Sequence, residues 1–202
     1  MRHYFTHTLE MGQEKILAHG TREYLALVDV ETYPPFVGKE IDHLDLMAHL
    51  YGQMKALTAI AWGSPPGTQN LRLVLTENDH AADHVAPSSW HTTASGWLRT
   101  NGRLCLTSHD RLHDCARHRT HGLLREEHLP KDSRPRVLNV PPGVYSVLVL
   151  YHFHYPFPIE TPADRPPVPV PKVPYTVILR HYAFPAPRIA PIRLPGLVPW
   201  AA

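Results

Sequence analysis

Two histidines near residue 150 have a spacing that could support metal chemistry. His152 and His154 alternate along an expected β-strand, so both rings would project from the same face. Two imidazoles on one face are half of a zinc or iron site, which needs at least a third protein ligand. His181, on a later expected strand, is a candidate for that ligand, although its spacing does not select it. The competing interpretation is a sheet surface with two solvated histidines.

Two further histidine pairs have a four-residue spacing: His80 with His84, and His109 with His113. On a helix, the members of each pair would share a face. Neither pair contains the glutamate of the H-E-x-x-H zinc motif, so no metalloprotease is implied. The chain has 16 histidines, and pairs at this spacing arise easily by chance. The sequence therefore assigns no metal and no cofactor.

Cys105 and Cys115 are the two cysteines of this 202-residue chain, which is too few for a disulfide framework. Cys115 lies among basic side chains, which could lower a thiol pKa and make it a nucleophile. No general base or oxyanion donors can be assigned to it. We expect a buried thiol and an ordinary one. The chain also lacks G-x-G-x-x-G, the phosphate-binding P-loop and G-x-S-x-G, so we expect no enzyme activity.

A polar segment over residues 109–135 is rich in histidine and arginine and has only scattered leucines. A short helix is expected near 109–117, and the rest of the segment is expected to be a surface loop. Such loops present side chains to partners without disturbing the core. The proline-rich segment 156–174 is a second candidate contact region. The predicted partner-binding side chains are His109, Arg111, His113, Arg117, Arg119, His121 and Arg125.

The basic residues between Arg99 and Arg136 leave a nucleic-acid-associated protein as an alternative. Interleaved aromatic side chains, on which bases would stack, are absent from this region. The formal net charge of the chain is only +2, which is too small to indicate nucleic acid. Nucleic-acid binding is therefore not favoured.

Strand patterns dominate the chain. Strands are expected at 2–9, 14–18, 23–30, 71–77, 90–99, 103–108, 136–140, 144–154 and 175–182. The strand at 23–30 has apolar residues on both faces, so we expect both faces to be covered. Thr100-Asn101-Gly102 predicts a hairpin turn with a return strand from Arg103, and Pro141-Pro142-Gly143 predicts a second turn.

One helix is expected from about 43 to 61. Asp42 is a suitable N-cap, and Asp45 places a negative charge in the first turn. Apolar residues recur at three- and four-residue spacing from Leu44 to Leu57. Gly63 and the prolines after it are typical of a helix end.

These elements predict a mainly β protein: an antiparallel β-sandwich with one inserted helix and a proline-rich C-terminal extension. With 43% hydrophobic residues, the chain can bury a sizeable core. Residues 1–155 form the expected sandwich. Residues 156–202, with the strand at 175–182 and a packed tail, are assigned to the same domain. The first residues lack the apolar core of a signal peptide, and no apolar run is long enough to span a membrane, so a cytoplasmic location is expected.

Two short stretches carry a family resemblance: G-R-L-C-L-T-S at 102–108 and V-P-P-G-V-Y-S-V-L-V at 140–149. With them the chain resembles small bacterial immunity-type proteins, including relatives of the competence-associated nuclease inhibitors that are encoded beside secreted toxins. W-G-S-P-P-G-T-Q-N-L-R-L-V-L at 62–75 fits the same pattern, and the resemblance covers about 43–154. It implies a β-sandwich scaffold that binds and neutralises a partner protein. The proline-rich extension after 155 departs from that pattern.

The sequence thus predicts a non-enzymatic cytosolic binding protein, an immunity protein whose partner is a cognate toxin or effector. A mild positive charge would steer it toward an acidic patch on that partner. The alternatives are a metal-dependent enzyme that uses His152 and His154, and the nucleic-acid-associated protein described above.

Overall fold

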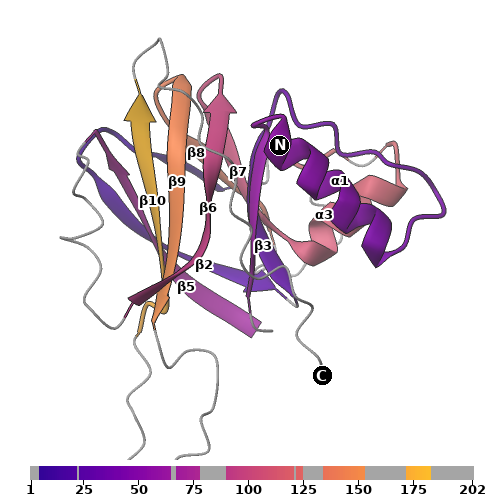
Figure 1. Ribbon diagram of the computed structural model, residues 1–202, viewed down its shortest axis with the longest axis horizontal. Helices are drawn as coiled ribbons and strands as arrows, with labels where there is room; N and C mark the ends of the chain where they lie inside the picture. Colours follow the sequence, from indigo (N-terminus) through magenta and orange to yellow (C-terminus); the bar gives the residue numbers. More distant parts are fainter. Residues whose placement is uncertain are drawn as a thin grey trace, which may run out of the picture.

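The computed structural model describes residues 5–21, 23–64, 67–77, 90–120, 122–124, 134–152 and 172–182. These residues form ten strands and two helices (Figure 1). The strands are β1 (Phe5–Thr8), β2 (Glu14–Thr21), β3 (Tyr24–Asp29), β4 (Ala59–Gly63), β5 (Gly67–Thr76), β6 (Trp90–Thr100), β7 (Arg103–Ser108), β8 (Arg136–Asn139), β9 (Gly143–His152) and β10 (Tyr175–Tyr182). The helices are α1 (His43–Lys55) and α3 (His109–Arg117). The prediction of a mainly β protein is confirmed.

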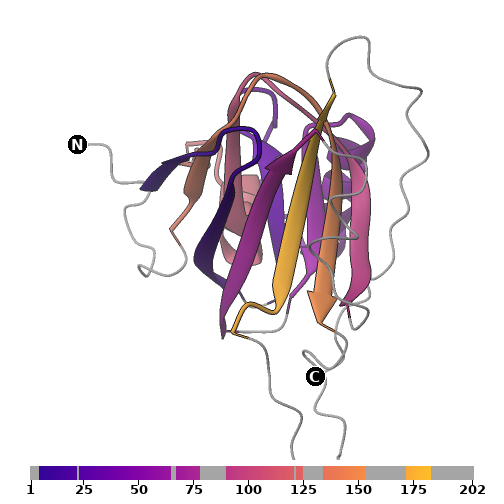
Figure 2. The same cartoon turned by 90° about the vertical axis from the view of Figure 1, so that its left-hand side faces the viewer.

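The strands form two five-stranded sheets. The first has the order β1-β8-β7-β3-β4, and the second, seen face on in Figure 2, has the order β2-β5-β10-β9-β6. Each sheet contains one parallel pair, β1 with β8 and β5 with β10, so both sheets are mixed, and the predicted antiparallel pairing holds for the other six pairs. Turn signals in a sequence report connections between neighbouring strands. A parallel pair instead joins strands that are far apart in the chain, and no turn residue marks it.

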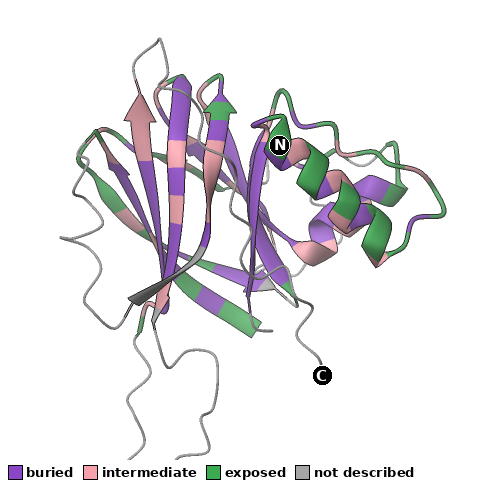
Figure 3. Ribbon diagram, in the orientation of Figure 1, coloured by how far each residue is buried: buried purple, intermediate pink, exposed green. Residues whose placement is uncertain are grey.

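Both helices lie on the side of β3 that faces away from β6, β9 and β10 (Figure 1). The strand between these two layers is buried along its whole length, which confirms that both of its faces are covered. One cluster of buried side chains draws on both sheets and on the helices. Figure 3 shows the contrast between the buried strands and the exposed outer side of α1. We call α1, α3 and the segment 33–38 the helical layer.

The turn at 100–102 does not close a hairpin, contrary to the prediction. It joins β6 in the second sheet to β7 in the first, and these strands pair with other partners. Buried Asp29 at the end of β3 holds this corner, because it accepts hydrogen bonds from Thr100 Oγ1 at 2.6 Å and Asn101 N at 3.2 Å. Gly102 has a φ of 109° and lies against the carbonyl of Val140, so the corner after β8 packs on this one.

Helix α1 begins where expected but ends at Lys55, not at 61. Leu57 has a φ of 64°, and the Leu57 and Thr58 amides donate to the carbonyls of Met54 and Gln53. This is a Schellman ending with leucine at the position that glycine usually occupies. The next apolar residues form β4, which the sequence did not predict. A short apolar run has no periodicity that separates strand from helix.

The fold-class prediction had one inserted helix, but the fold contains a second one, α3, which has the bounds of the short helix expected near 109–117. Strand β10 has the predicted bounds and lies between β5 and β9 in the second sheet. The proline-rich segment before it (up to residue 171) and the tail from residue 183 lie outside the described residues. Within the described residues, no helix is long and apolar enough to span a membrane.

Candidate functional site

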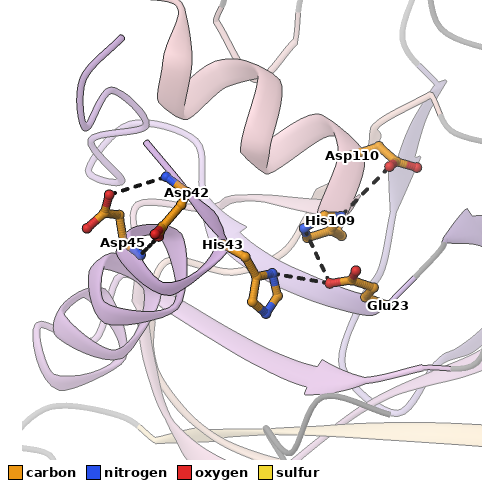
Figure 4. A network of polar contacts seen from close by, with 6 residues as sticks. All are labelled: Glu23, Asp42, His43, Asp45, His109 and Asp110. Carbon is orange, nitrogen blue, oxygen red and sulfur yellow. Dashed lines mark hydrogen bonds and ion pairs between the residues drawn. The ribbon is translucent and has the colours of Figure 1, made fainter. Parts of the chain in front are cut away.

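Three side chains meet where α1 and α3 begin, beside the start of β3: Glu23, His43 and His109 (Figure 4). The Glu23 Oε2 atom lies 3.3 Å from His43 Nδ1 and 3.5 Å from His109 Nε2. One potential ligand atom from each residue lies within 4.8 Å of the other two. A carboxylate and two imidazoles at this separation can hold a divalent metal ion or form a small ion-pair network.

The local structure determines the backbone positions of these three residues. Glu23 directly precedes β3, and His43 is the first residue of α1. Asp42 and Asp45 form a capping box at that helix start, since each side chain accepts a hydrogen bond from the other residue's amide at 2.9 and 3.2 Å. His109 follows β7 directly as the first residue of α3, and the last residue of β7 pairs with β3. Strand pairing therefore brings His109 to Glu23.

His109 is the most buried member of the cluster, with a side chain 15% exposed against 50% for Glu23. Burial lowers its pKa, and the neighbouring carboxylates of Glu23 and Asp110 act in the opposite direction. The Tyr24 ring meets the imidazole edge to face, with centroids 4.8 Å apart. Both ring nitrogens are shielded from solvent, and neither has a hydrogen-bond partner among the described residues. The site thus contains a largely buried imidazole whose nitrogens have ion-pair contacts with Glu23 and Asp110 but no hydrogen bond among the described residues.

Sequence reasoning found only part of this cluster. His109 and His113 were singled out as a pair that would share a helix face, and on α3 their ring centroids are 5.8 Å apart. Glu23 and His43 were missed. No local motif marks either one, because their proximity arises from the pairing of β3 with β7 and the placement of α1. A weak signal was present in His43, which directly follows the predicted N-cap.

The predicted partner-binding residues have different environments. Arg117 and Arg119 are exposed at the end of α3, and His109 and His113 are partly buried near its start. Arg111 is buried and holds the chain after α3 in place, because its guanidinium donates to the carbonyls of Gly122 and Leu123 and pairs with Asp114. These contacts place the Arg111 side chain inside the fold, where it anchors the segment after α3. His121 and Arg125 lie outside the described residues.

Three arginines of the 99–136 region contact different parts of the fold. Arg111 is internal, the Arg119 guanidinium lies 5.4 Å from the Phe36 ring centroid, and the Arg136 guanidinium lies 4.2 Å from that of Phe5 on β1. These three arginines do not line one groove.

His152 and His181 lie at opposite ends of β9. His181 pairs in register with Tyr145 near the start of the strand, and its Nε2 is 3.2 Å from the Pro142 carbonyl oxygen. His152 pairs with Trp90 at the far end, about 23 Å away at roughly 3.3 Å per residue. His181 therefore cannot complete a metal site with His152. His154 and the pair at 80 and 84 lie outside the described residues.

Both cysteines are buried free thiols. Burial raises the pKa of Cys105 to about 12 and that of Cys115 to about 11, so both remain protonated at neutral pH. This confirms the expected buried thiol at Cys105. The raised pKa of Cys115 is the opposite of the lowered pKa that an activated nucleophilic thiol requires.

No protein-family model and no curated protein sequence matches this chain. Among solved structures, it is similar to a protein described as "Crocagin biosynthetic gene J", with 18% sequence identity and a TM-score of 0.48. The similarity covers 84% of this chain and 96% of that one.

Proposed function

We propose that the chain is a non-enzymatic binding protein of the bacterial cytosol that neutralises a partner protein, such as a toxin, through its helical layer. In this proposal the two sheets pack as a sandwich that serves as the scaffold. The observation that carries the proposal is the set of apolar side chains exposed on the helical layer. They are Phe36, Val37, Leu44 and Tyr51, with exposed fractions of 37%, 38%, 73% and 42%.

Cations accompany the two exposed aromatic rings of this set. The Arg119 guanidinium lies 5.4 Å from the Phe36 ring centroid, and Lys55 Nζ lies 4.2 Å from the Tyr51 ring centroid. Aromatic side chains and arginine are enriched in the cores of protein interfaces, and cations at the rim steer an acidic partner toward the surface. These features support a partner that offers an apolar surface bordered by carboxylates. A stable complex would bury roughly 800 Å² on each side.

The test is quantitative capture of partner proteins by the tagged chain from cells that encode it. We expect Leu44→Glu to weaken recovery of the principal partner by about tenfold or more, because it places a charge in the apolar contact. An acidic residue in the first turn is compatible with the helix dipole, so α1 should remain folded. Circular dichroism of the variant checks this.

Ile16→Glu is the matched control. Ile16 is an exposed apolar residue, 53% accessible, on β2 of the second sheet and away from the helical layer. The proposal expects this variant to capture the partner as the wild type does. Loss of the partner with Ile16→Glu and full recovery with Leu44→Glu would place the interface on the second sheet and refute the assignment.

A further inference from the structure

We propose that Glu23, His43 and His109 together bind one divalent transition-metal ion of the zinc class. This inference is independent of partner binding. It rests on the geometry of the three side chains and on the buried His109 imidazole, whose nitrogens make no hydrogen bond among the described residues.

The separations already approach those of a metal site. Zinc–nitrogen and zinc–oxygen bonds of about 2.0–2.1 Å in a tetrahedral site place neighbouring ligand atoms about 3.3 Å apart. The two distances from Glu23 Oε2, 3.3 Å to His43 Nδ1 and 3.5 Å to His109 Nε2, match this edge. All three ligand atoms lie within 4.8 Å of one another, so the third edge is at most about 1.5 Å longer than the tetrahedral value. Movement of the partly exposed His43 side chain would close that difference.

The second observation is that the buried imidazole of His109 makes no hydrogen bond. Buried polar atoms normally have a hydrogen-bond partner. Within the described part of the chain, neither ring nitrogen of His109 makes a hydrogen bond, and both nitrogens are shielded from solvent. Nε2 has an ion-pair contact with Glu23 at 3.5 Å, and a metal ion between the two groups would be coordinated by both. The Asp110 carboxylate, 3.8 Å from Nδ1, is placed to orient the ring from the other side, as outer carboxylates do in zinc sites.

The ligand set also selects the class of metal. Two imidazoles and one carboxylate suit zinc, iron or copper, whereas calcium and magnesium prefer sites made of oxygen ligands. Glu23 is half exposed, so ions can reach the site from solvent. Three protein ligands leave the fourth tetrahedral position to water or to a donor from another molecule.

The experiment is a titration of metal-free protein with Zn²⁺ in the presence of a competing chelator, and a parallel titration with Co²⁺ followed by its visible absorption. We expect one equivalent to bind to the wild type. Glu23→Gln and His43→Ala should each lower the affinity at least tenfold. Both side chains are substantially exposed, so these variants should fold, which circular dichroism verifies. His109→Ala is less suitable as the sole test, because it removes a largely buried ring.

His118→Ala is the matched control in a chain with 16 histidines. His118 is exposed at the end of α3, and its removal should leave the affinity unchanged. Wild-type protein that binds no equivalent would overturn the proposal, and so would Glu23→Gln and His43→Ala variants that bind as the wild type does. In either case the cluster is an ion-pair network only.

Discussion

Asp29 is the buried charge that holds the corner between the two sheets. Its carboxylate accepts hydrogen bonds from the Thr32 amide and hydroxyl at 2.7 and 2.8 Å, from the Glu31 amide at 3.0 Å, and from Thr100 and Asn101 across the corner. Burial on its own would raise the pKa of Asp29, but the hydrogen bonds from Thr100, Thr32 and Asn101 hold it below its ordinary value of 3.8. Asp29 therefore joins the end of β3 to the turn at 100–102 that connects the two sheets.

Asp29→Asn should destabilise the fold. The amide keeps one acceptor but turns an NH₂ group toward donors, and a hydrogen bond to a charged group contributes about 1.5–3 kcal/mol. We expect a loss of about 2–3 kcal/mol in the free energy of unfolding at pH 7, measured by urea denaturation. Glu40→Gln, at an exposed residue outside this corner, is the control and should change stability by less than about 0.5 kcal/mol.

The contribution of Asp29 to the free energy of unfolding should decrease at low pH. Since the pKa is lower in the folded state, the carboxylate stabilises the fold fully above the unfolded-state pKa of about 3.9. That contribution is lost as pH falls through the lower folded-state pKa. The stability gap between wild type and Asp29→Asn should therefore be constant near neutrality and shrink below about pH 4. A gap that widens on acidification would contradict this account.

At the scale of elements, the start of α1 depends on its capping box. Asp42 is exposed, so substitution there affects the cap without opening a cavity. We expect Asp42→Ala to cost about 1 kcal/mol in the free energy of unfolding and Asp42→Asn to cost much less, because asparagine is also a good N-cap. Urea unfolding measures both. Glu40→Ala, exposed and outside the helix, serves as control, and equal losses in all three variants would argue against a specific cap.

The two ends of this helix illustrate what the sequence can predict. Its start was correct because an N-cap aspartate is a local chemical signal. The predicted end was wrong because Leu57 adopts the left-handed conformation that glycine normally supplies. A leucine in the sequence does not indicate a helix end. Strands β7 and β10 had the predicted bounds, since their alternation and flanking turns are local. Strand β4 was not predicted, because its apolar residues were assigned to the end of the helix.

At the scale of the whole molecule, the prediction failed where distant segments meet. The turn at 100–102 was recognised as a turn, but only the pairing of β6 with β9 and of β7 with β3 makes it a corner between sheets. The cluster of Glu23, His43 and His109 has the same origin, because its members lie at the starts of β3, α1 and α3, which tertiary contacts bring together. Local chemistry identified His109 alone among them.

The same topology leaves the helical layer as an outer face with several exposed apolar side chains, which is the basis of the proposed binding role. The most direct test is amide hydrogen exchange of the chain alone and in complex with its captured partner. The account predicts slower exchange in 33–55 and in α3, with β2 and β5 unchanged. Slower exchange confined to β2 and β5, with the helical layer unaffected, would contradict it.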